Sequence, residues 1–275
     1  MASASEDKPV RHVLGVSGGK DSAALALYMR DRVPEMEYYF TDTGKELPET
    51  YDFLTKLESA LGKPIARLNS DCDFDHWLWV NNGMLPSPQV RWCTRYLKIR
   101  PFEEWVGQDR VRSYIAIRAD EDRDGYVSSN PNIVPVFPFK EDGIVKADVF
   151  RILEESSVGV PEYYKWRSRS GCFFCFFQRK YEWVKLAELH PDLFQKAIEY
   201  EDKVNYQRTA SAEKFTWAQK ETLRELIARK DSILADYARR LDSESARTPN
   251  RPLIDVLAGI LDDEDTADLC TACHW

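Results

Sequence analysis

Residues 13–22 read Val13-Leu14-Gly15-Val16-Ser17-Gly18-Gly19-Lys20-Asp21-Ser22, and this stretch predicts a buried strand that turns into a helix. Val13, Leu14 and Val16 form the apolar run, and strong helix formers follow at residues 23–29. Gly18 and Gly19 permit backbone conformations that other residues rarely adopt, and they allow a ligand to approach closely. Because the amino end of a helix carries unpaired N–H groups and a positive dipole end, to which Lys20 adds a charge, we expect a phosphate group to bind here.

The first half of the chain alternates between strand and helix patterns. The predicted elements after the first helix are a strand at 37–41, a helix at 48–61, a strand at 65–68, a helix near 99–106 and a strand at 113–117. This alternation predicts an α/β fold, a parallel twisted sheet with helices on both faces. Ligands of such sheets bind at the carboxyl ends of the strands, which is where the loop from Ser17 to Asp21 would lie.

The second half is predicted to be mainly helical. Helical patterns cover residues 180–188 and 192–202, with Pro191 between them, and a charged amphipathic stretch follows at 215–241. We therefore expect a nucleotide-binding α/β domain at residues 1–147 and a mainly helical region at 148–275.

Composition limits the functions that this chain could have. Its net charge of −8 argues against broad, non-specific DNA binding, although basic residues gather between residues 91 and 123 and between 165 and 180. No apolar run reaches roughly 18 residues, so no membrane span is expected. Residues 1–8 lack the apolar stretch of a signal peptide, and we expect a cytoplasmic protein. The six cysteines then suggest metal ligands, redox groups or buried core rather than a disulfide scaffold.

Four further motifs stand out. They are Thr41-Asp42-Thr43-Gly44 followed by Pro48-Glu49-Thr50-Tyr51, the cysteine-bearing segment from Arg91 to Pro101, the segment from Ile117 to Arg123, and Gly171-Cys172-Phe173-Phe174-Cys175. Taken alone, Asp-Thr-Gly is also an ordinary turn, and the cysteines could be buried in an aromatic core. The spacing of Cys172 and Cys175 is typical of a metal site, and Cys93 would bring the number of thiolates to three.

The hexapeptide Ser-Gly-Gly-Lys-Asp-Ser resembles the PP-loop of ATP pyrophosphatases, and it is not a Walker P-loop. Together with the four other motifs, which occur in the same order, it resembles the phosphoadenosine phosphosulfate (PAPS) reductase family over about residues 13–178. The resemblance implies an adenine nucleotide alpha hydrolase-like fold. It also implies an enzyme that releases pyrophosphate from ATP while adenylylating a substrate oxygen, which sulfur then replaces.

The resemblance also assigns roles to residues. ATP would be held by Ser17, Gly18, Gly19, Lys20, Asp21 and Ser22, with Asp42, Thr43 and Gly44 lining the nucleotide pocket. The catalytic residues would be Lys20, Asp21, Arg118 and Arg123. Asp21 would help to place Mg²⁺, and the arginines would stabilise charge on the phosphates.

The three cysteines Cys93, Cys172 and Cys175 would hold a [4Fe-4S] cluster with one iron left open. Zinc is the less favoured alternative, since it needs a fourth ligand such as His190. Cys270-x-x-Cys273 could be a second redox pair, a sulfur-accepting thiol or an incidental feature of the tail.

Within this family the complete phosphate loop suits ATP, and residues 269–275 lack the Glu-Cys-Gly motif of true PAPS reductases. This combination resembles the ATP pyrophosphatases of DNA phosphorothioation in the Dnd and Ssp systems. The resemblance implies a cysteine desulfurase as sulfur donor and DNA delivered by partner proteins. A PAPS or adenosine phosphosulfate reductase with a thiol donor, a tRNA thiolation enzyme and a non-catalytic nucleotide-binding subunit of a defence complex remain alternatives.

Overall fold

The computed structural model describes residues 9–122, 128, 130–206, 214–218 and 221–247, with the side chains of 243–247 left out. The described part forms two compact units. Residues 9–73 and 93–162 make the first, and residues 74–92 and 163–247 make the second. The boundary predicted between residues 147 and 148 falls inside a helix of the first unit, and the division into domains 1–147 and 148–275 stays a prediction.

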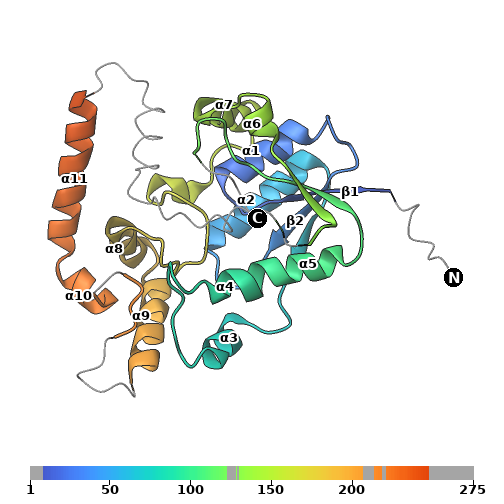
Figure 1. Cartoon of the computed structure of the whole chain (residues 1–275). Coiled ribbons are helices and arrows are strands. Elements are labelled where there is room, and N and C mark those ends of the chain that lie inside the picture. The colour runs from blue at the N-terminus through green and yellow to red at the C-terminus, as the bar shows by residue number, and fades with distance from the viewer. Residues whose placement is uncertain (1–8, 123–127, 129, 207–213, 219–220, 248–275) are drawn as a thin grey trace. The chain divides into compact units, whose positions relative to one another are not determined.

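The first unit is built on a five-stranded sheet (Figure 1). Its strands are β1 (Arg11–Gly15), β2 (Glu37–Thr41), β3 (Ile65–Leu68), β4 (Val111–Tyr114) and β5 (Ile133–Val136). They lie in the order β3-β2-β1-β4-β5, and every neighbouring pair is parallel. Val13 at the centre of the sheet lies opposite Glu37 on one side and Ser113 on the other. The predicted parallel α/β fold is therefore confirmed.

Helices cover both faces of this sheet because the side chains of the strands alternate between them. The helices are α1 (Lys20–Met29), α2 (Pro48–Leu61), α4 (Trp92–Thr94, whose first residue belongs to the second unit), the π-helical turn η1 (Arg95–Ile99), α5 (Arg100–Val106), α6 (Pro138–Glu141) and α7 (Lys146–Glu155). Leu14, Tyr38 and Phe40 pack with the apolar residues of α1, α2 and α7 in one buried cluster. Tyr39 faces the other way and stacks on Phe102 of α5, with the ring centroids 4.7 Å apart. Figure 1 shows α1 and α5 on opposite sides of the sheet.

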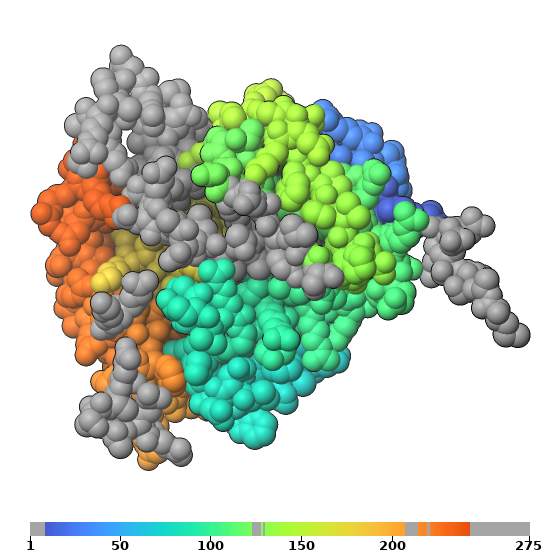
Figure 2. Space-filling view, viewed as in Figure 1, coloured from blue at the N-terminus to red at the C-terminus, as the bar shows by residue number. Residues whose placement is uncertain are grey.

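The second unit is helical, and its residues 163–247 belong to the region that was predicted to be mainly helical. Its helices are α3 (Phe74–Val80), the 3₁₀ turn η2 (Glu162–Lys165, whose first residue belongs to the first unit), α8 (Lys180–Leu189), α9 (Pro191–Asn205), α10 (Leu223–Ala228) and α11 (Lys230–Arg247). α8 packs against α9, α10 and α11. In Figure 2 the outer faces of α6 and α7 lie at the surface of the first unit, and that of α11, in orange-red, at the surface of the second. None of the described helices combines the length and apolar character that crossing a membrane requires.

Two sequence predictions need correction at the level of single elements. The strand predicted at 113–117 is β4 at Val111–Tyr114, because Ile115 and Ile117 are buried by packing after the strand has ended. β5 was not predicted; it contains Pro135 and, among the described strands, pairs with β4 alone. The stretch at 215–241 contains α10 and most of α11, separated at Arg229.

Candidate functional site

The strand order places a topological switch point between β1 and β4. After β1 the chain crosses over through α1 to β2, whereas β4 pairs on the opposite side of β1. The chain therefore leaves β1 and β4 in opposite directions, and such switch points are where open α/β sheets bind ligands. Residues 17–21 follow β1, and Arg118 follows β4, so both predicted segments belong to this end of the sheet.

The loop after β1 has a conformation that requires glycine. Gly18 has φ of +76°, and a Cβ atom there would lie only 2.6 Å from Cγ2 of Thr50 on α2. The Ser17 N–H donates to Oγ of Ser22 at 3.1 Å. The Ser22 hydroxyl in turn donates to the Gly19 carbonyl at 3.2 Å. The hydroxyl of Ser22 thus closes the loop in this structure, and its predicted phosphate contact stays a prediction.

Lys20, Asp21 and Arg118 lie together at the start of α1. Nη1 of Arg118 is 2.8 Å from Oδ1 of Asp21, and Nζ of Lys20 is 3.2 Å from Oδ2. All three residues are buried. Arg118 also pairs with Asp120 at 2.9 Å and with Glu121 at 3.6 Å. A buried carboxylate that bridges two cations is well compensated, and removing any one of these groups would leave an unbalanced buried charge.

The second predicted loop lies against the first through the contact of Thr50 with Gly18. Oδ1 of Asp42 accepts hydrogen bonds from the Gly44 N–H and the Tyr51 hydroxyl, both at 2.8 Å. Oγ1 of Thr43 donates to Oε1 of Glu46 at 3.0 Å. Asp42 and Thr43 therefore shape the turn into α2, and their role in lining a nucleotide pocket stays a prediction.

The sequence analysis did not name Glu46, and it quoted Thr50 within a motif without giving it a role. Glu46 is buried beside Thr43, and Thr50 is fully buried against the phosphate loop. No pattern in the sequence distinguishes Glu46 from Asp42 and Glu49, which are only partly buried, because its burial depends on the turn formed by Asp42.

The cysteine motif of the second unit forms a tight turn. The Cys175 N–H donates to the Cys172 carbonyl at 3.0 Å, and both residues are half-buried thiols. Gly171 precedes them with φ of +140°. Arg167, which the sequence analysis did not single out, donates to the carbonyls of Gly171 and Cys172 at 3.0 and 2.7 Å.

The predicted set of three metal-binding cysteines is divided between the two units. Cys93 is a half-buried thiol of the first unit, whereas Cys172 and Cys175 belong to the second. Within the described ranges, no three His, Cys, Asp or Glu side chains are grouped so that they could hold a metal ion. The chemistry of the Cys172–Cys175 pair fits two ligands of an iron–sulfur or zinc site, and the complete set stays a prediction. Arg123, Cys270 and Cys273 lie outside the described residues.

Two curated relatives share part of this chain, both of them uncharacterized proteins of Methanocaldococcus jannaschii. MJ0973 is 26% identical over 202 residues, which cover 69% of this chain and 47% of the relative. MJ0066 is 28% identical over 216 residues, covering 72% of this chain and 43% of the relative. The matched region thus spans less than half the length of either relative.

Solved structures with similar folds include a PAPS reductase from Candida auris in complex with phosphate. It has a TM-score of 0.46 and 16% identity, over 62% of this chain and 84% of that protein. Another is the U34-tRNA thiolase NcsA from Methanococcus maripaludis with its [4Fe-4S] cluster, at a TM-score of 0.40 and 14% identity over 80% of each chain. Independently of these structures, residues 11–131 match the family model of the phosphoadenosine phosphosulfate reductase domain, in agreement with the family resemblance of the sequence motifs.

Proposed function

We propose that this protein is an ATP pyrophosphatase that adenylylates a substrate oxygen for sulfur transfer. The observation that carries the proposal is the buried cluster of Lys20, Asp21 and Arg118 beside a glycine turn at the switch point of the sheet. The match of residues 11–131 to the PAPS reductase domain supports an adenine nucleotide as the ligand.

The charges of the cluster suggest how it would receive ATP. Among the described side chains, the two cations Lys20 and Arg118 face the three carboxylates of Asp21, Asp120 and Glu121. A triphosphate would therefore enter together with Mg²⁺, which Asp21 could help to hold. Lys20 and Arg118 would then bind the phosphate oxygens, where they would stabilise the charge of the leaving pyrophosphate.

DNA is our proposed sulfur acceptor, through backbone phosphorothioation. The complete phosphate loop, the three cysteines and the family resemblance support this choice. In this scheme a cysteine desulfurase supplies the sulfur, and because the net charge of the chain is −8, partner proteins help to deliver the DNA. Cys93, Cys172 and Cys175 would hold an iron–sulfur cluster through their thiolates.

A PAPS reductase is the second candidate, because the family model that matches residues 11–131 is that of the reductase domain. Such an enzyme would take PAPS with a thiol donor and would not cleave ATP. The two functions differ in the bond that is broken, so one set of assays separates them.

The test is pyrophosphate release from ATP and Mg²⁺ by anaerobically purified protein. We expect release by the wild type and a loss of at least roughly a hundredfold in Asp21→Asn. Asp31→Asn is the matched control, because the side chain of Asp31 is exposed and pairs only locally with Arg30. Thiol-dependent sulfite release from PAPS without pyrophosphate release from ATP would instead establish the reductase. Binding of ATP without turnover in either assay would overturn both enzymatic functions.

A further inference from the structure

Arg167 carries a buried positive charge that no carboxylate of the described residues pairs with. The residue is 1% exposed, which places it among the largest fully buried side chains of the described part of the chain. Its Nη1 and Nη2 donate to the carbonyls of Gly171 and Cys172. Among the residues that the structure describes, no ion pair to Arg167 is found, and its buried Nε has no acceptor.

This arrangement is costly unless a further group balances it. Taking a charge out of water is unfavourable, and carbonyl dipoles compensate it less well than an opposite charge does. Glu182 is a buried carboxylate that binds the residue after Arg167. Its two oxygens accept from the Ser168 N–H at 2.6 Å and the Arg179 N–H at 3.0 Å. Glu182 therefore ties the segment after Arg167 to the start of α8 and does not meet the guanidinium.

The cysteine turn lies directly beside this charge. A Cβ atom on Gly171 would lie 3.9 Å from Nη2 of Arg167 and also 3.9 Å from Sγ of Cys175, so the guanidinium and this sulfur border the same residue. Arg169, two residues further along, has a second buried guanidinium nitrogen without an acceptor, while its guanidinium packs on the ring of Phe177. The charge of Arg167 thus borders the turn that carries the two thiols, whose metal-bound forms are anionic.

We propose that Arg167 is a positioning residue of the cysteine turn. Its two hydrogen bonds fix the carbonyls of Gly171 and Cys172, and its charge balances an anionic, thiolate-bound metal group held by Cys172 and Cys175. This inference rests on the assignment of these cysteines as ligands in the proposed function. Beyond that assignment, the inference is that metal binding depends on Arg167. Arg167 does not bind the metal itself but holds the backbone of the cysteine turn in place.

The test uses Co²⁺ as a probe in the full chain, with thiolate-to-metal charge-transfer absorption as the readout. We expect the band to disappear in Cys175→Ser and the affinity for Co²⁺ to fall by roughly ten- to a hundredfold in Arg167→Met. Arg167→Lys keeps the charge but cannot make the two forked hydrogen bonds, so its affinity should lie between those of the wild type and Arg167→Met. Arg169→Met is the matched control and should bind Co²⁺ within about threefold of the wild type, since its guanidinium donates to neither carbonyl of the turn.

Circular dichroism and thermal unfolding of each variant separate loss of the site from loss of the fold. If Arg167→Met does not fold, the comparison of Arg167→Lys with Arg169→Lys decides the question. Unchanged Co²⁺ affinity in a folded Arg167 variant would overturn the inference, and so would a charge-transfer band that survives Cys175→Ser. Because this assay contains no ATP, an Arg167-dependent cobalt site in a protein that releases no pyrophosphate would sustain this inference and reject the proposed ATP chemistry.

Discussion

Gly18 is the residue on which the shape of the phosphate loop most directly depends. Two separate effects exclude a side chain there, the positive φ of +76° and the 2.6 Å approach of a Cβ atom to Thr50. Gly62, at the end of α2, shares only the first effect, since its φ is +64° and nothing lies within 4 Å of its Cβ position. The two glycines therefore allow backbone strain to be separated from steric conflict.

We expect Gly62→Ala to lower the free energy of unfolding by roughly 1 to 2 kcal/mol, the usual cost of a left-handed backbone for an L-residue. Gly18→Ala should cost clearly more, because it adds the clash with Thr50. Thr50→Ser removes the methyl group concerned and should recover part of the excess in the double variant. Urea unfolding of the four variants measures this. Equal costs at Gly18 and Gly62 would mean that Thr50 moves aside and that the loop is not fixed against α2.

At the scale of single residues, the sequence identified the groups that a local motif presents. Lys20 and Asp21 were predicted from the loop and Arg118 from its place after a strand, and the structure brings the three together. Arg167 could not be found in this way. It lies in a basic segment with Lys165 and Arg169. Lys165 is exposed and Arg167 is fully buried, and this difference arises only when the cysteine turn folds.

The same limit appears at the scale of elements. The helix at 48–61 and the strands at 37–41 and 65–68 were predicted with the bounds of α2, β2 and β3, because periodicity, Pro48 and Gly62 mark them locally. The strand β4 was displaced because the apolar run continues beyond the sheet through Ile115 and Ile117. A buried loop and a buried strand both give an apolar run in the sequence. Only the hydrogen-bonded pairing with β1 shows where the strand ends.

The helix α9 contains a carboxyl group that should make the second unit less stable as the pH rises. Burial raises the pKa of Glu201 to about 7, although N–H groups of Trp217 and Leu223, each at 2.8 Å, favour its ionised form. Because the pKa is 4.5 in the unfolded chain and higher in the folded one, the stabilisation is fully present below pH 4.5 and is lost as the pH rises through 7.

We therefore expect the free energy of unfolding of the wild type, relative to Glu201→Gln, to fall by about 2 kcal/mol between pH 5 and pH 8. The quantity to compare is the slope of the free energy of unfolding against pH. The absolute values are less useful, because the amide N–H group of Gln would face a backbone N–H and lower the stability at every pH. Urea unfolding at several pH values measures it.

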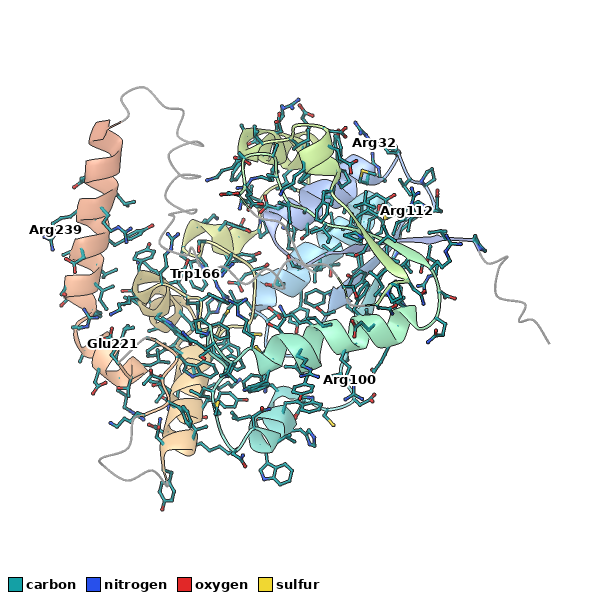
Figure 3. The ribbon with its side chains drawn as sticks, in the orientation of Figure 1. Arg32, Arg100, Arg112, Trp166, Glu221 and Arg239 are labelled. Carbon is teal, nitrogen blue, oxygen red and sulfur yellow. The ribbon has the colours of Figure 1, made fainter. Side chains whose placement is uncertain are left out.

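Glu221, labelled in Figure 3, provides the control of opposite sign. Hydrogen bonds from Arg229, and then Lys180, hold the pKa of Glu221 down to about 2, so its contribution is lost only as the pH falls below 4.5. Glu221→Gln should leave the slope between pH 5 and pH 8 unchanged. Parallel slopes for the wild type and Glu201→Gln would show that Glu201 stays ionised in the folded protein.

At the scale of the whole molecule, the two units are interleaved along the chain. The second unit takes residues 74–92 from between β3 and β4 and joins them to residues 163–247. The contacts of Phe74 show this directly, because its ring packs on Phe174 at 4.5 Å and also on Tyr200 and Trp217. A segment inserted in the α/β part thus depends for its core on the helical part.

Phe74→Ala should therefore destabilise the second unit, although residue 74 lies only six positions after the end of β3. The ring is 1% exposed, and deleting a buried aromatic side chain costs about 3 to 5 kcal/mol. Amide hydrogen exchange should show lost protection in α8 and α9 and retained protection in β1, β2 and β4. Leu57→Ala, in the core of the first unit, should give the reverse distribution. Equal loss of protection in both units after Phe74→Ala would mean that the chain unfolds as one cooperative body, in which case burial in either unit stabilises both.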